Sequence, residues 1–123
     1  MKIALLLYGI SLDLDYNGLS INCILDNFYN YKENILDCYE DIDVYLCTND
    51  MSKVNKTKIL ELYKPKDYIF YNNTNSNNSL KERNIKIQKV IELCLKSNIT
   101  YDNVIITRFD LYFSTINISS LII

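Results

Sequence analysis

The chain has 123 residues, of which 49% are hydrophobic and 23% are charged, and its net charge is -2 at pH 7. This composition is typical of one globular domain, and its slightly acidic balance gives no field that would attract nucleic acid or anionic lipid. The chain has no histidine, and its four cysteines form no C-x-x-C pair. These features argue against the usual Cys/His zinc sites and against Ser-His-Asp or Cys-His catalysis.

Apolar, strand-forming runs alternate with amphipathic helical patterns along the chain. This strict alternation predicts βαβ crossovers. It therefore predicts a single three-layer α/β/α domain over residues 1–123, with a mostly parallel sheet of four or five strands. The predicted strands cover residues 2–8, 43–48, 67–71 and 103–107, and the predicted helices cover residues 19–39, 52–63 and 79–97.

No segment approaches the roughly 20 apolar residues that a membrane-spanning helix needs. The opening apolar run lacks a cleavage site of small residues and soon meets Asp13 and Asp15, so we interpret it as a strand and not as a signal sequence. The chain is rich in Asn, Ile, Lys and Tyr, a bias typical of AT-rich viral and microbial genomes. We therefore expect a protein of the cytoplasm, which is the host cytoplasm if the chain is viral.

The third predicted helix combines an apolar stripe with a loosely basic one. Core-facing positions are expected at Ile87, Val90, Ile91, Cys94 and Leu95. Arg83, Lys86 and Lys89 recur every third residue and can either face the phosphates of a ligand or lie in solvent. Solvent is the favoured interpretation, because Lys and Arg usually fill exposed helix faces. Arg83 stays a candidate ligand contact as one of only two arginines in the chain.

The fourth predicted strand leads into two opposite charges, Arg108 and Asp110. Side chains at i and i+2 of a strand share a face, so both would emerge together at the carboxyl edge of the sheet, where open α/β folds bind ligands. Arg108 suits a phosphate, which a guanidinium binds bidentately, and Asp110 suits a divalent cation or ribose hydroxyls. The alternative is a half-exposed ion pair worth about 0 to 1 kcal/mol.

Four segments in this order, KIALLLYG, DVYLCTND, LYKPKDYIFY and YDNVIITRFDLYF, resemble the nucleotide-sugar-binding half of GT-A type glycosyltransferases. The resemblance is to a divergent group, common in capsule-type loci and large viruses, whose motif after the fourth strand is R-x-D in place of D-x-D. It covers most of the chain and is most specific at residues 101–113. It implies a Rossmann-like domain that binds a nucleoside diphosphate sugar.

The resemblance also implies site residues. Tyr8, Gly9 and Ile10, at the end of the first strand, would lie beside the nucleoside. Asp110 matches the second aspartate of D-x-D, which chelates Mn²⁺ or Mg²⁺ on the diphosphate. Arg108 stands at the position of the first aspartate, and a guanidinium cannot ligate a metal. Arg108 can instead stabilise the charge of a departing nucleoside diphosphate, which leaves metal dependence open.

Asp50 follows the second predicted strand, in the group Thr48-Asn49-Asp50. The resemblance implies that Asp50 approaches the nucleotide and hydrogen-bonds its base or ribose. The alternative, which residue type alone favours, is capping of the next helix, since Asn, Asp and Ser are preferred at that position.

The predicted function is therefore binding of a nucleoside diphosphate sugar and transfer of the sugar to an unidentified acceptor. GT-A domains usually continue well beyond the R-x-D motif, so an isolated donor-binding half, a truncated product and a degenerate relative all fit the sequence. The alternative function is that of a non-catalytic remnant or interaction module with the same fold. A second copy or a completing chain would then be its partner.

Overall fold

The computed structural model describes residues 1–9, 21–50, 52–71 and 79–108. Within these residues strands and helices alternate as the sequence predicts, and a short 3-10 turn follows the first helix. The elements are, in chain order, β1 (Lys2–Gly9), α1 (Ile21–Asn34), η1 (Leu36–Cys38), β2 (Asp41–Asn49), α2 (Lys53–Tyr63), β3 (Asp67–Tyr71), α3 (Ser79–Lys96) and β4 (Asn103–Arg108).

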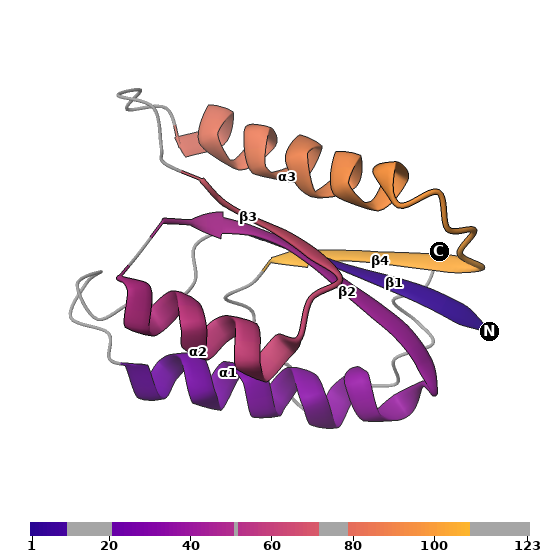
Figure 1. The fold of residues 1–123 in the computed structure, drawn as a ribbon, viewed down its shortest axis with the longest axis horizontal. Helices are drawn as coiled ribbons and strands as arrows, with labels where there is room; N and C mark the ends of the chain where they lie inside the picture. Colours follow the sequence, from indigo (N-terminus) through magenta and orange to yellow (C-terminus); the bar gives the residue numbers. More distant parts are fainter. Residues whose placement is uncertain (10–20, 51, 72–78, 109–123) are drawn as a thin grey trace.

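The strands of the described residues form one sheet in the order β3-β2-β1-β4, and each neighbouring pair is parallel. Helices α1 and α2 cover one face of this sheet and α3 covers the other, which makes three layers (Figure 1). The predicted α/β fold class is therefore confirmed. The central strands β1 and β2 are buried on both faces, and this explains their nearly continuous apolar sequences.

Alternation of side chains along each strand divides the hydrophobic residues between two cores. On β1, Ile3, Leu5 and Leu7 face α1 and α2, whereas Ala4 and Leu6 face α3. The core under α1 and α2 also includes Phe28, Tyr31, Ile35, Val44, Leu46, Ile59, Tyr63 and Ile105. The core under α3 also includes Tyr45, Cys47, Val90, Leu93 and Cys94.

The ends of the first two helices follow from local conformation. Helix α1 ends at Asn34, earlier than predicted, because Ile35 leaves the helical region with φ -128° and ψ -60° and buries its side chain. Helix α2 begins after Ser52, whose hydroxyl oxygen accepts a hydrogen bond from the backbone N–H of Asn55 at 3.3 Å. It ends before Lys64, which has φ 45° and precedes Pro65.

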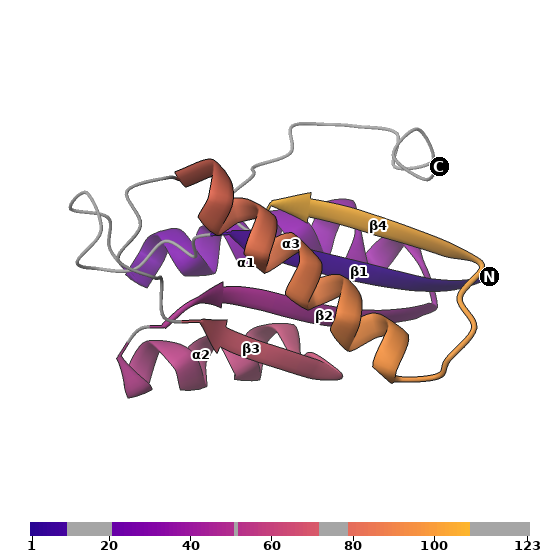
Figure 2. The same cartoon turned by 90° about the horizontal axis from the view of Figure 1, so that it is seen from above.

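Helix α3 crosses the sheet obliquely and packs on β1, β2 and β3, with its first turns at the end to which the strand arrows point (Figure 2). Its predicted apolar stripe is confirmed at Val90 and Cys94 but is wrong at Leu95, which is 71% exposed. On the same face of the sheet, Val104 and Ile106 of β4 are 38% and 46% exposed. Helix α3 therefore leaves part of β4 uncovered.

Candidate functional site

The order of the strands defines where a ligand would bind. The chain adds β2 and β3 on one side of β1 and then returns to add β4 on the other side. The crossover through α3 lies on the opposite face from α1 and α2 (Figure 1). The strand order thus reverses between β1 and β4, and open α/β sheets bind ligands outside the carboxyl ends of the strands at such a reversal.

Tyr8 and Gly9 end β1 at this reversal. Tyr8 is half-buried and packs against the core under α3. Gly9 has φ +105°, a conformation that side chains rarely adopt, and a Cβ at this position would meet no atom of the described residues within 4 Å. Within the part of the chain that the structure describes, nothing therefore fills the space beside the backbone at the end of β1. Ile10, the third residue implied by the resemblance, lies outside the described residues.

Arg108 ends β4 directly beside Tyr8, its partner in the parallel register. Arg108 is exposed, and its backbone carbonyl accepts a hydrogen bond from the hydroxyl of the buried Tyr31 of α1. Because α1 covers the face of the sheet away from α3, this bond fixes the end of β4 from the α1 side. Asp110 lies outside the described residues, so its pairing with Arg108 stays a prediction.

Asp50 lies at the carboxyl end of β2, one strand further along the same edge from Tyr8. Its carboxylate forms an ion pair with Lys56 of α2 at 2.6 Å, and its backbone N–H donates to the carbonyl of Tyr71 at 3.1 Å. The residue that caps α2 is Ser52. The carboxylate of Asp50 is therefore held toward the α2 side of the edge.

The favoured interpretation placed the whole basic stripe of α3 in solvent, but its three residues differ in exposure. Arg83 is exposed, Lys89 is half-buried, and Lys86 is buried with only 2% of its surface accessible. The Lys89 ammonium lies 5.4 Å from the centre of the Tyr71 ring, at the carboxyl end of β3. For Lys86 the solvent interpretation is wrong, because this residue faces the sheet.

The groups around Lys86 come from α3 and from the carboxyl ends of two strands. Burial lowers the pKa of Lys86 from its ordinary value, against smaller attractions to Cys47 and Glu82. Burial also raises the pKa of the Cys47 thiol to about 11, so this thiol is neutral near pH 7. Glu82 is 6% exposed, and its carboxylate accepts a hydrogen bond from the hydroxyl of Tyr71. Lys86 thus faces the sheet from α3, close to Cys47 and Glu82.

The sequence does contain a signal that Lys86 is buried, namely its spacing from the buried residues of α3. Steps of four residues lead back from the buried Cys94 and Val90 to Lys86 and Glu82. Residues four apart share one face of a helix, so this stripe runs from the core to the carboxyl edge of the sheet. The residue types alone conceal it, because two of its members are charged.

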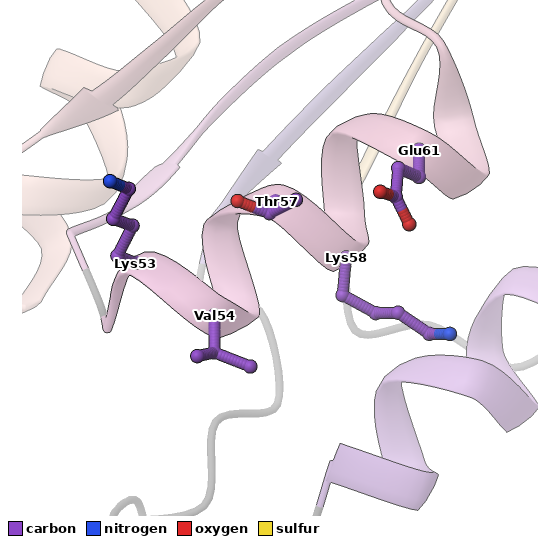
Figure 3. A pocket seen from close by; sticks show the side chains of 5 residues that line it. All are labelled: Lys53, Val54, Thr57, Lys58 and Glu61. Carbon is purple, nitrogen blue, oxygen red and sulfur yellow. The ribbon is translucent and has the colours of Figure 1, made fainter.

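A separate hollow of about 420 Å³ lies along α2 (Figure 3). Those of its lining residues that are described all come from this one helix: Lys53, Val54, Thr57, Lys58 and Glu61. Val54 is 76% exposed there. Because this lining brings together no groups from different elements, we do not place the functional site in it.

Comparison with known proteins adds no identification. Protein-family models, curated proteins and solved structures were each compared with this chain, and none of them matches it. Among the described residues, no group of three or more carboxylates and thiols could hold a metal ion. None of the helices in this part of the chain is long and apolar enough to cross a membrane.

Proposed function

We propose that this chain binds a nucleoside diphosphate sugar at the carboxyl edge of its sheet, as a glycosyltransferase-like protein. The observation that carries the proposal is the register of β1 with β4. It brings Tyr8 and Arg108 side by side where the strand order reverses, next to the open backbone of Gly9. An exposed arginine at that point suits the phosphates of a nucleotide.

Each residue has a distinct part in this proposal. Tyr8, Gly9 and Ile10 contact the nucleoside, and Asp50 hydrogen-bonds its base or ribose. Arg108 binds the diphosphate, and Asp110 holds either a ribose hydroxyl or the Mn²⁺ or Mg²⁺ that the resemblance implies. The exposed Arg83 extends the positive surface from the second turn of α3.

The reaction that such a site supports is sugar transfer. The bond between the anomeric carbon and the diphosphate oxygen breaks, and the electron pair leaves with the nucleoside diphosphate. A new bond forms from the anomeric carbon to an acceptor hydroxyl, whose proton is released. Arg108 stabilises the negative charge that develops on the leaving group, and this contribution is larger in the transition state than in the ground state.

Isothermal titration calorimetry with UDP, GDP and their sugar conjugates tests the proposal. We expect at least one nucleoside diphosphate to bind, and Arg108→Ala to weaken binding by about tenfold or more, because a charge-assisted contact is lost. Asp110→Asn is expected to weaken it as well. Lys96→Met, at the far end of α3, is the matched control and leaves the affinity unchanged. Absence of binding by every nucleotide, with and without Mn²⁺, contradicts the proposal.

One observation favours the alternative of an interaction module with the same fold. β4 is an edge strand of the described sheet, and its Val104 and Ile106 side chains are exposed on the face that α3 leaves uncovered. An exposed apolar edge strand is a template for pairing with another chain. Sedimentation equilibrium with the wild type and with Ile106→Lys distinguishes the two functions. Self-association abolished by Ile106→Lys, without nucleotide binding, favours the module.

A further inference from the structure

The most unusual charged group in the described residues is the ammonium of Lys86. The residue is 2% exposed, yet its ammonium forms no hydrogen bond or ion pair within the described part of the chain. The ammonium nitrogen is not one of the fully enclosed polar atoms of the described residues, so it keeps some contact with solvent while the rest of the side chain is buried. Partial burial of an ammonium group without such partners costs free energy, and native proteins rarely retain it without a compensating role. A charge held in this way at a ligand-binding edge is a candidate for function.

The neighbours of Lys86 do not compensate its charge at short range. Glu82, one turn earlier on α3, attracts it, but the carboxylate of Glu82 already accepts a hydrogen bond from Tyr71. Cys47 of β2 presents a neutral thiol, because burial raises its pKa to about 11. The positive charge therefore remains available to a ligand that brings negative charge of its own.

Further cations lie around Lys86 at the same edge. Lys89, one turn later on α3, has its ammonium over the ring of Tyr71. Arg108 lies two strands from Cys47, across Tyr8 in a continuous register, which is a separation of about 10 Å. The carboxylate of Asp50, which directly follows β2 at this edge, is paired with Lys56. A ligand that spans from Arg108 to Lys86 therefore meets positive charge at both ends.

We propose that Lys86, assisted by Lys89, binds a phosphate group of an anionic ligand between α3 and the carboxyl ends of β1 and β2. This inference rests on the proposed function, in which that group belongs to the diphosphate of the sugar donor. The inference adds that the ammonium of Lys86 supplies the positive charge that a metal ion supplies in D-x-D proteins. Affinity for the diphosphate should then persist in the presence of EDTA.

Calorimetry with two probes, inorganic pyrophosphate and UDP, tests this site in EDTA-containing buffer. We expect both to bind to the wild type, and Lys86→Met to weaken both by about tenfold or more, since an ionised donor is lost. Lys96→Met, which removes the same charge at the other end of the same helix, leaves both affinities unchanged. Lys86→Met affinities equal to those of the wild type overturn the inference.

A second variant separates an anion site from a buried structural pair. Glu82→Gln keeps the size of the side chain but removes the nearest competing negative charge. If Lys86 binds phosphate, this variant should bind pyrophosphate more tightly than the wild type, by about threefold or more. A lower or unchanged affinity overturns the inference. The Glu82→Gln variant therefore tests the phosphate site even if Lys86→Met fails to fold.

The two probes keep the inference and the proposed function apart. UDP binding that is retained in Lys86→Met but lost in Arg108→Ala refutes the lysine site and supports the proposed function. Pyrophosphate binding that depends on Lys86, without binding of any nucleoside diphosphate, supports the anion site and refutes the proposed function. No binding of either probe to the wild type refutes both.

Discussion

The two edges of the sheet differ in how a lysine is held at each of them. At the amino edge, the Tyr101 hydroxyl donates to Asp43 and bonds the Tyr45 hydroxyl, both at 2.6 Å. Lys2 adds its ammonium at 3.1 Å from Asp41, and its backbone N–H donates to Asp102 at 2.7 Å. At the carboxyl edge, Asp50 pairs with Lys56 and Tyr71 donates to Glu82, whereas the ammonium of the buried Lys86 has no such bond in the described residues.

This difference separates an edge that contributes to stability from the edge at which we propose ligand binding. A fully connected polar network in a partly buried site contributes to folding and fixes geometry. A buried charge without short-range partners opposes folding, and such groups concentrate at ligand sites. Asp43, near the amino end of β2, thus belongs to the hydrogen-bonded edge, whereas Tyr8, Gly9 and Arg108 belong to the edge at which we propose binding.

The largest expected effect comes from breaking the network at the amino edge. Tyr101→Phe removes the hydroxyl that joins Asp43 to Tyr45. We expect the free energy of unfolding to fall by about 1 to 3 kcal/mol, because partly buried partners lose their hydrogen bonds. Urea denaturation measures the change. The control is Tyr68→Phe at an exposed tyrosine of β3, and equal losses in the two variants would show that the network contributes nothing special.

The second prediction concerns the pH dependence of stability, to which Tyr101 and Lys86 should contribute with opposite signs. Burial, and then hydrogen bonds to Asp43 and Tyr45, raise the pKa of Tyr101 above its ordinary 10.0. Above pH 10 the unfolded state therefore loses this proton before the native state does, and stability falls. Burial lowers the pKa of Lys86 below 10.5. Between the lowered pKa of Lys86 in the native state and 10.5, its pKa in the unfolded state, the unfolded state binds the additional proton. In this range the contribution of Lys86 makes stability rise with pH.

Alkaline urea titrations of two variants isolate these contributions. Relative to the wild type, Tyr101→Phe should lose less stability as the pH rises above 10, while Lys86→Met should lack the gain just below pH 10.5. Near pH 7, Lys86→Met should be as stable as the wild type or more stable by about 1 kcal/mol, since it removes a buried charge. Parallel pH profiles for all three proteins would contradict the assignment of the two edges.

A smaller effect is expected at Asp50. Its ion pair with Lys56 is about one-third exposed on each side, so Lys56→Ala should lower the free energy of unfolding by only about 0 to 1 kcal/mol. Nucleotide affinity gives the sharper result. If Asp50 contacts the base or ribose, Asp50→Asn weakens UDP binding, whereas Lys56→Ala does not. Loss of affinity in both variants would instead indicate that the pair orders the end of β2.

The smallest perturbation is a chemical one. Cys38 is exposed, whereas Cys47 is buried and its thiol has a pKa of about 11. Iodoacetamide at pH 8 should therefore alkylate Cys38 well before Cys47, because the thiolate is the reactive form. Peptide mapping by mass spectrometry measures the two rates. Rapid labelling of Cys47 would mean that the carboxyl edge opens more readily than its packing under α3 implies.

Much of the fold could be predicted from sequence, because its strands are short apolar runs between clear helical patterns. The stretch from Asp67 to Tyr71 is an example, since prediction and structure agree at both ends. Helix α1 was predicted to be longer, because the apolar Ile35 and Leu36 continue its pattern but lie in a separate turn. The position of β1 between β2 and β4 depends on pairings across the whole chain, which local patterns do not encode.

The candidate site was predictable in its strand-end residues and less so on α3. Tyr8 and Arg108 end their strands, so parallel pairing alone was enough to bring them to one edge. Lys86 was assigned to solvent by residue type, and Leu95 to the core, and both assignments were wrong. Which face of α3 is buried depends on the angle at which the helix crosses the sheet, and the tertiary contacts of Val90 and Cys94 set that angle.

The most direct test of the difference between the edges is a nuclear magnetic resonance titration of the ¹⁵N-labelled protein with UDP. We predict that the backbone amide signals of Gly9, Arg108 and Lys86 shift with a common saturation curve, while those of Lys2, Asp43 and Tyr101 stay in place. Shifts confined to the amino edge, or no shifts at saturating UDP, would contradict a nucleotide site at the carboxyl edge.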